Sequence, residues 1–502
     1  MSGREELLDA ASAKSAPKPG SSVASGAFYT MLSRVGFILS GYAIHFIMAY
    51  LLSPAEYGTL GVIISLITLW RVFLSAGLPQ TTSQFIAGDE QRAYGIWRQA
   101  LKIQMLASLG LWAIYALGTP LWVLLLNDPS LGPDILISSF LIPFMAWFQV
   151  NQGYYVGRLE FGRNALYLWI YSLARVVLAV ALALVGLRVH GAVLGMTLAV
   201  LVAAMTTHFG IPKTSADVGG DKPDWRAMVG FSLPLVMVSL GISALLNLDL
   251  LQLQRFYPDG ELVGFYNGAV NLGKSPYFLL ATFATTVLPS VSQKLKAGDH
   301  DAARRLVSKH TTYVILLSLP FAALVAGSGD KLLDFVYPAK YAVAWAPLAL
   351  LIFSMSGLAL LSVLTAALTA AGKPRVSMLI IMGCVVTQVA LGTLLIPRYQ
   401  MLGTAVANLT TVSVGVVACS VLVKRTFGEV LELSRVLKAT AISLVIGGTL
   451  SFWRSYPITV LPLVYGVGLL LYAAAMVALG AISPQERALL NKALGRLKRV
   501  FA

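Results

Sequence analysis

Residues 342–370 read AVAWAPLALLIFSMSGLALLSVLTAALTA and contain no charged side chain. About 20 apolar residues in a helix are enough to cross a hydrocarbon core of about 30 Å. Similar apolar runs recur between residues 27 and 480. Because lipid offers no hydrogen-bond partners, such runs cross it as helices, whose backbone groups bond within the segment. The sequence therefore predicts an all-α, polytopic membrane protein.

The composition of the chain agrees with this fold class. Of the 502 residues, 57% are hydrophobic and 12% are charged, about half the charged fraction of a soluble domain. In a soluble protein, the formal net charge of +15 would suggest a nucleic-acid partner. In a membrane protein it follows from the Lys and Arg side chains that gather in cytoplasmic loops. We therefore expect membrane lipids as partners and no nucleic acid.

About fourteen transmembrane helices are expected, in two six-helix bundles followed by two C-terminal helices. Their predicted limits are 27–52, 58–86, 100–126, 133–155, 164–187, 190–210, 229–253, 263–290, 310–328, 342–370, 375–396, 402–423, 436–453 and 457–480. We assign residues 27–210 to the N-terminal bundle, 229–424 to the C-terminal bundle and 425–480 to the last two helices.

The segments outside these spans are short. Residues 1–26 mix Ser, Ala, Lys and Pro, and we expect a disordered cytoplasmic tail without a signal peptide. Residues 211–228 are charged and are expected to form a cytoplasmic linker between the bundles. We expect a basic amphipathic cytoplasmic tail at 481–502 and a surface helix at 291–309. The longest loop on the opposite side is expected at 328–341.

Two short motifs recur at nearly one spacing. Pro79 and Pro289 each precede a Ser-Gln pair near the end of a predicted span, and they lie about 210 positions apart. Gly191 and Gly403 each begin a predicted span and have nearly the same offset. Both members of each pair fall on one side of the membrane, so we interpret the two bundles as parallel repeats.

Basic residues are distributed unevenly between the two sides of the membrane. With the N-terminus inside, the cytoplasmic loops and the two tails hold 27 of the 37 Lys and Arg residues. The opposite side holds six, namely Arg188, Arg255, Lys331, Lys340, Arg398 and Arg454. Since cytoplasmic loops are enriched in Lys and Arg, we expect a multi-pass protein of the cell (inner) membrane with both termini in the cytoplasm.

Four basic residues fall well inside predicted spans, away from their ends: Arg34, Arg71, Arg175 and Lys274. At the centre of a lipid-facing helix each would cost about 2.5–3.5 kcal/mol. Asp249 is the only carboxylate that we place well within a span, so it cannot neutralise all four cations. We expect the cations to face a hydrated cavity that receives an anion.

Several of these residues also have a structural interpretation. Arg34 lies near the start of its span and its side chain can extend to the membrane surface, and Arg175 can instead donate hydrogen bonds to helix carbonyls. Asn267, Asn271 and Lys274 share one helical stripe by their i, i+4, i+7 spacing, which favours a polar, substrate-binding lining.

Two residues are candidates for ion coupling. Asp249 is an intramembrane carboxylate, which is by default a functional candidate, although an ion pair with a nearby cation is an equal alternative. His45 lies on nearly the same helix face as Arg34 and is either a proton carrier or a packing residue.

The chain lacks the sequence motifs of an enzyme. We find no G-x-S-x-G, H-E-x-x-H or P-loop pattern, and no Cys/His cluster. Cys384 and Cys419 lie inside apolar runs and are interpreted as small buried side chains. We therefore expect no catalytic residues, no cofactor and no metal.

Several short motifs follow one another along the chain at residues 52–58 (LSPAEYG), 247–249 (NLD), 260–269 (GELVGFYNGA), 288–289 (LP) before Ser292, 337–347, and 371–375 (AGKPR). Together they resemble the polysaccharide transporter branch of the MOP flippase superfamily. The resemblance implies translocation of a lipid-linked oligosaccharide from the inner to the outer leaflet by alternating access. It also implies possible partners among polysaccharide polymerases and chain-length proteins.

The resemblance also bears on the cations. Lipid II flippases of this superfamily place basic residues of three helices in the central cavity, which correspond here to Arg34, Arg71 and Lys274. This chain has Lys at position 274 where the family would have Arg, which keeps the charge and loses the planar fork.

Four alternatives remain open. A MATE-like exporter of cationic drugs is expected to have an acidic cavity, and the excess of intramembrane cations disfavours it. A lipid II-type flippase agrees with the same features. A membrane-embedded glycan polymerase or ligase is expected to have a long external catalytic loop, which the sequence does not contain. A protein that organises lipids without transporting them is the remaining alternative.

The orientation is testable by cysteine accessibility. Because residues 298 and 485 fall on the side rich in Lys and Arg, cysteines introduced there should resist a membrane-impermeant reagent in intact cells and react after permeabilisation. Labelling of either position in intact cells would contradict the predicted topology.

Overall fold

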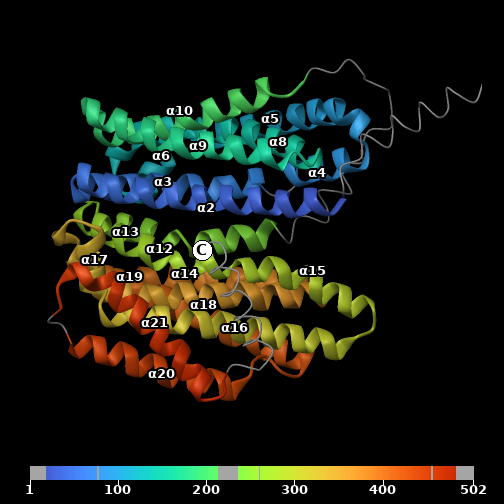
Figure 1. Cartoon of the computed structure of the whole chain (residues 1–502). Coiled ribbons are helices and arrows are strands. Elements are labelled where there is room, and N and C mark those ends of the chain that lie inside the picture. Colours follow the sequence, from blue (N-terminus) through green and yellow to red (C-terminus); the bar gives the residue numbers. More distant parts are fainter. Residues whose placement is uncertain (1–18, 76–77, 213–235, 259, 454–455, 482–502) are drawn as a thin grey trace, which may run out of the picture. The chain divides into compact units, whose positions relative to one another are not determined.

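The computed structural model describes residues 19–75, 78–212, 236–258, 260–453 and 456–481, and the secondary structure of this part of the chain is helical (Figure 1). Most of the expected linker 211–228 and of the expected tail 481–502 lies outside these residues. The chain divides into two compact units. Unit 1 comprises Met1–Leu51, Trp70–Val123 and Pro129–Ser232, and unit 2 comprises Leu52–Leu69, Leu124–Asp128 and Leu233–Ala502.

Unit 1 contains most of the first helices of the chain. They are α2 (Pro19–Leu51), the end of α3 (Pro54–Ser75), α4 (Leu78–Gly88), α5 (Ala93–Leu117), α7 (Gly132–Ser139), α8 (Leu141–Gly157), α9 (Phe161–Leu182) and α10 (Arg188–Phe209). The short helix α6 (Thr119–Leu126) begins in unit 1 and ends in unit 2.

Unit 2 begins with the first part of α3 and holds the remaining helices. They are Val236–Leu245, α12 (Leu248–Phe256), α13 (Glu261–Gly273), α14 (Ser275–Leu280), α15 (Thr282–Lys296), α16 (His300–Gly327), α17 (Gly329–Val336), α18 (Trp345–Ala370), α19 (Pro374–Phe427), α20 (Leu433–Phe452) and α21 (Leu461–Ala478).

The described helices include several that can span a membrane, as in a polytopic membrane protein. Ten helical stretches are long and apolar enough to cross a membrane, or eleven if Val236–Leu245 and Leu248–Phe256, which meet at 47°, form one bent span. Two of the ten, Phe161–Phe209 and Pro374–Phe427, each contain a break and cover two predicted spans. The predicted span 263–290 is divided among α13, α14 and α15.

Positive φ angles mark the breaks within the two longest helical stretches. Gly186 has φ 100° and Arg188 has φ 46° between α9 and α10, and Gln400 has φ 52° within α19. A helical residue needs a negative φ, so the helix cannot continue through these positions. Pro397 lacks a backbone N–H and adds to the disruption in α19. The breaks confirm the predicted divisions near residues 187–190 and 396–402.

Three local predictions are corrected by the structure. The helix α2 begins at Pro19, so residues 19–26 belong to it and not to a disordered tail, because Pro is well suited to a first helical turn. The segment 291–309 is not one surface helix, since α15 and α16 both extend into it and meet at a turn where Gly298 has φ 74°. The loop 328–341 contains the helix α17.

The turn at Gly298 also affects the cysteine-accessibility experiment. Because a cysteine at Gly298 would be strained, Lys296 is the better position for the introduced cysteine.

The first turns of α3 pack closely against α13 within unit 2. A Cβ atom on Gly58 would lie 2.7 Å from the Gly260 carbonyl oxygen and 2.8 Å from the Gly264 nitrogen, and one on Gly264 would overlap Pro54. Small residues allow helices to approach in this way within a membrane. The motifs 52–58 and 260–269 therefore meet at one helix contact.

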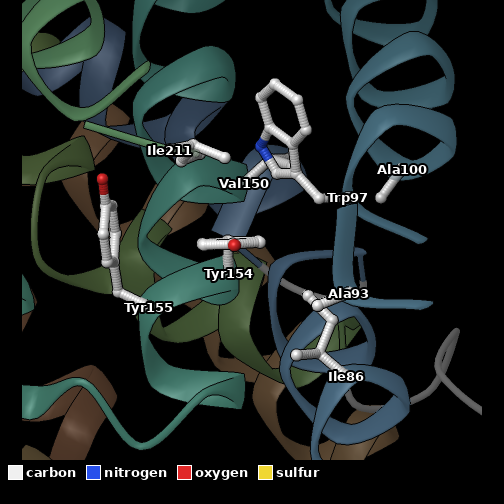
Figure 2. Packing of buried hydrophobic residues seen from close by; sticks show 8 residues of the cluster. All are labelled: Ile86, Ala93, Trp97, Ala100, Val150, Tyr154, Tyr155 and Ile211. Carbon is white, nitrogen blue, oxygen red and sulfur yellow. The ribbon is translucent and has the colours of Figure 1, made fainter. Parts of the chain in front are cut away.

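A cluster of buried apolar side chains anchors one end of unit 1 (Figure 2). It contains Ile86 from α4, Trp97 from α5 and Val150, Tyr154 and Tyr155 from α8, all of them 4% exposed or less. Among them runs a polar connection, in which Trp97 Nε1 donates to Asn151 Oδ1 (2.9 Å). These contacts hold α8 in a fixed position, and the other face of α8 lines the cavity described next.

Candidate functional site

A cavity of about 460 Å³ lies within unit 1. Its wall is formed by α2, the end of α3, α4, α8 and α9. Two of the predicted cations, Arg34 and Arg71, line it. Among the described lining residues none is acidic. The structure thus brings these two arginines to one cavity, whose charge is positive.

The helical period explains which residues reach the cavity. The lining side chains follow spacings of three and four along each helix, which place them on one face. They are Thr30, Ser33, Arg34 and Phe37 on α2, Met145, Phe148, Gln149, Gln152, Gly153 and Val156 on α8, and Phe161, Asn164, Leu168 and Tyr171 on α9, with Arg71, Pro79, Gln80 and Ser83 completing the wall.

The Ser and Thr hydroxyl groups of this wall are bound to their own helices. Thr30 Oγ1 donates to the Gly26 carbonyl (2.8 Å), Ser33 Oγ to the Thr30 carbonyl (3.0 Å) and Ser83 Oγ to the Gln80 carbonyl (2.7 Å). Such bonds to the preceding turn are a common alternative for Ser and Thr in helices. The guanidinium and carboxamide groups therefore provide the polar chemistry of the cavity.

Arg175, a further predicted cation, lies behind this wall and not in its lining. Its side chain is 8% exposed, and Nη2 donates to the Phe37 carbonyl (3.0 Å) and to Ser40 Oγ (2.6 Å). The guanidinium stacks on the Phe37 ring at 4.7 Å and on the Tyr171 ring at 5.4 Å. The structure therefore favours the alternative in which Arg175 bonds a helix carbonyl, and its two ring partners line the cavity.

Lys274 belongs to unit 2, where it lies at the break between α13 and α14. Its ammonium donates to Asn247 Oδ1 (3.3 Å) and interacts electrostatically with Asp249. Asp249 is fully buried and accepts hydrogen bonds from the Tyr266 hydroxyl (3.0 Å) and the Leu250 nitrogen (2.8 Å). This arrangement gives Lys274 polar partners within its own unit, and it matches the alternative of an interaction between Asp249 and a nearby cation.

Asn267 and Asn271 are engaged in helix packing. Asn267 is 3% exposed and donates to the Tyr57 carbonyl (3.1 Å), while Asn271 Nδ2 donates to Asn267 Oδ1 (3.0 Å). Gly61 has no side chain, so Asn267 packs directly on α3. The predicted polar stripe exists, but its two asparagines join α13 to α3 and are not among the residues that line the unit 1 cavity. His45 is half-buried on α2, and it too is absent from that lining.

The sequence analysis missed a second buried carboxylate. Asp134 on α7 is 1% exposed, so Asp249 is not the only acid buried within the helices. Its Oδ1 lies 2.7 Å from His190 Nδ1 on α10. Asp134 lies at the edge of its predicted span. A hydropathy pattern does not show which residues at the end of a span are covered by a neighbouring helix, so the sequence did not indicate that Asp134 is buried.

Two other cavities lie within unit 2. A groove of about 920 Å³ between α20 and α21 is lined almost entirely by apolar side chains such as Val445, Leu463 and Val467. The other, of about 620 Å³, has a mixed lining that includes Lys296, Asp301 and Arg304, and Arg304 is paired with Glu429 at 3.1 Å. The groove suits hydrocarbon, and acidic groups partly neutralise the mixed cavity.

Comparison with known protein families shows to which family this chain belongs. The family model described as "Polysaccharide biosynthesis protein" matches residues 23–294, more than half of the chain. The chain belongs to the polysaccharide biosynthesis protein family. A second model, described as "Lipid II flippase MurJ", matches residues 259–472. The families and relatives that the chain matches are those of transporters and flippases and not of enzymes.

A relative with a known role in polysaccharide biosynthesis is consistent with this family. The chain is 22% identical over 329 residues to the succinoglycan biosynthesis transport protein ExoT of Rhizobium meliloti (strain 1021), a match that covers 65% of each chain and thus just under two thirds of that relative.

Solved structures share the fold of this family member. A lipid II flippase MurJ in an inward closed conformation has a TM-score of 0.72 at 14% identity and covers 90% of this chain and 98% of its own. An inward-facing MATE family transporter has a TM-score of 0.64 at 13% identity and covers 78% and 95%. The protein is therefore an all-α polytopic membrane protein with the MOP fold, as predicted.

The role assigned to Arg175 is testable by stability. Arg175→Lys loses the planar group that bonds both Phe37 and Ser40 and stacks on two rings, so it should lower the free energy of unfolding by about 1–3 kcal/mol. Arg163→Lys is the matched control, because Arg163 is 59% exposed and pairs with Glu160 at the surface. Thermal unfolding in detergent measures the difference, and equal stability of the two variants would contradict the buried role.

Proposed function

We propose that this polysaccharide biosynthesis protein is a flippase for a lipid-linked oligosaccharide of the polyprenyl diphosphate class. In this proposal it moves the headgroup from the inner to the outer leaflet by alternating access, with both termini in the cytoplasm. The observation that carries the proposal is the unit 1 cavity, which holds Arg34 and Arg71 and no acid among its described lining residues.

The charge of the cavity supports an anionic ligand. A cation within a membrane is costly unless it faces water or a partner of opposite charge. Arg71 has the buried cation Arg175 as a neighbour, which repels it. Guanidinium groups bind phosphate through two parallel hydrogen bonds. A diphosphate would therefore satisfy both arginines at once.

The same observation argues against export of cationic drugs. A cationic drug would be repelled by the two arginines of the lining, whereas an acidic cavity would attract it. The ExoT relative is described as a transport protein of succinoglycan biosynthesis. This description agrees with the proposed class of ligand.

A lipid II-type precursor is the second candidate substrate, and the flippase model that matches residues 259–472 favours it. Both substrates carry a prenyl diphosphate, so the presence of Arg34 and Arg71 does not favour one substrate over the other. The family model over residues 23–294 includes the whole arginine cavity and favours the polysaccharide precursor.

We further propose that Asp249 and Lys274 form an ion-coupling pair in unit 2. Helix Val236–Leu245 ends just before them, and broken helices commonly form substrate and ion sites in transporters. Asn247 Nδ2 donates to the Ser243 carbonyl (2.7 Å) and Asn408 Nδ2 to the Leu245 carbonyl (3.2 Å), so carboxamides cover the carbonyls that the break exposes. Lys274 remains a predicted headgroup ligand, and His45 remains a predicted proton carrier.

Replacement of Arg71 tests the proposed flippase. Each charge-assisted contact to a diphosphate contributes about 1.5–3 kcal/mol, so Arg71→Ala should weaken headgroup binding by roughly 10- to 100-fold and abolish polymer export. Lys274→Arg should be tolerated better than Arg71→Lys, since only the second loses bidentate geometry. Complementation of export, with accumulation of the lipid-linked precursor in the inner leaflet, is the measurement. Full export by an Arg34→Ala, Arg71→Ala double variant at normal abundance would reject the cationic-cavity mechanism.

Replacement of Asp249 tests the coupling pair. Asp249→Asn keeps the shape and the hydrogen bond from Tyr266 and removes the charge that attracts Lys274. We expect transport by this variant to lose its response to a collapsed ion gradient. Flipping is followed in proteoliposomes with and without an imposed gradient. If Asp249→Asn transports at the normal rate and still responds to the gradient, Asp249 has no coupling role.

A further inference from the structure

Carboxamide side chains are the second polar feature of the unit 1 cavity. Gln80 of α4, Gln149 and Gln152 of α8 and Asn164 of α9 all line it. Each carboxamide has an oxygen that accepts hydrogen bonds and an NH₂ group that donates two. The wall therefore presents uncharged donors and acceptors next to Arg34 and Arg71.

Two of these carboxamides have a buried oxygen without a partner. Within the described part of the chain, Gln149 Oε1 and Asn164 Oδ1 accept no hydrogen bond. Buried polar atoms in proteins are nearly always paired, and an exception calls for an explanation. The last torsion of Gln and Asn is broad, so a small rotation turns either oxygen toward a ligand in the cavity that both side chains line.

We propose that Gln149 and Asn164 bind hydroxyl groups of the sugar attached to the diphosphate, and that this sugar is uncharged. The inference rests on the proposed flippase function and narrows its substrate class. Sugar hydroxyl groups donate to the two free amide oxygens, and the NH₂ groups of the same side chains donate to other sugar oxygens. The arginines at the same cavity bind the diphosphate.

The balance of charge supports an uncharged sugar. The described lining offers Arg34 and Arg71 as cations, and a diphosphate already carries the negative charge that they match. A sugar carboxylate would bring a further negative charge for which the described lining offers no additional cation. A hydroxyl group can donate to the amide oxygens of Gln149 and Asn164, so it is the better complement.

The geometry of the wall supports discrimination as well as binding. A site that is built to bond a hydroxyl group rejects a ligand that lacks it, because its own polar atoms then stay buried and unpaired. The hydroxyl groups of Thr30, Ser33 and Ser83 are already bound to helix carbonyls, so they compete little for the ligand. Recognition of the sugar thus depends on the carboxamides.

Binding of three defined probes to the purified full chain in nanodiscs tests the proposal. The probes are a prenyl diphosphate that carries one neutral hexose, the same lipid with a hexuronic acid, and the same lipid without sugar. Gln149→Leu and Asn164→Leu should each weaken binding of the hexose probe by about 2- to 10-fold, the range of one hydrogen bond. Binding of the sugar-free probe should not change.

Two further variants complete the design. Gln293→Leu replaces an exposed carboxamide of α15 that does not line the cavity, so it should behave as the unsubstituted chain. Arg71→Ala should weaken binding of all three probes.

The outcomes separate the two levels of the proposal. If the unsubstituted chain binds none of the probes, the proposed function fails. If it binds them and the Gln149 and Asn164 variants change all probes equally or none, the flippase function stands and the sugar contact is rejected. Equal affinity for the hexose and hexuronic acid probes would overturn the claim that the sugar is uncharged.

Discussion

Hydrocarbon offers no hydrogen bonds, so each polar group that this chain carries into the membrane needs a partner within the protein or within its ligand. The described helices meet this requirement locally. Thr197 Oγ1 donates to the Val193 carbonyl (2.9 Å), four residues before it on α10. Where the helix ends at Leu245, Asn408 supplies the missing donor. The requirement therefore makes any polar group without such a partner informative about function.

The intramembrane cations show how this requirement separates structure from function. Arg175 is satisfied by Phe37 and Ser40 and by two aromatic rings, so it stabilises the wall of the cavity. Lys274 has Asn247 and the charge of Asp249. Arg34 and Arg71 line a cavity without a described acid. Identical charges thus have different surroundings, and under the proposed function Arg34 and Arg71 are the cations best placed for an anionic ligand.

The sequence predicted the fold class well because the length and hydropathy of a span follow directly from membrane thickness. It also predicted that Arg34 and Arg71 share a cavity, since intramembrane charge is rare and conspicuous. It could not place Arg175 behind the wall or Asn267 against Tyr57, because both depend on which helices become neighbours. Gln149 and Asn164 were missed because uncharged polar residues are common in membrane helices, although their three- and four-residue spacing from other lining residues was visible.

The helix α8 shows how one element serves both the fold and the site. On one face, Val150, Asn151 and Tyr154 are fully buried in the cluster of Figure 2 or bonded to it. On the other face, Gln149 and Gln152 line the cavity. Sites built on rigid elements hold their side chains more accurately than sites on loops. Because Gln149 and Gln152 are not part of the cluster of Figure 2, their substitution leaves the contacts of that cluster in place.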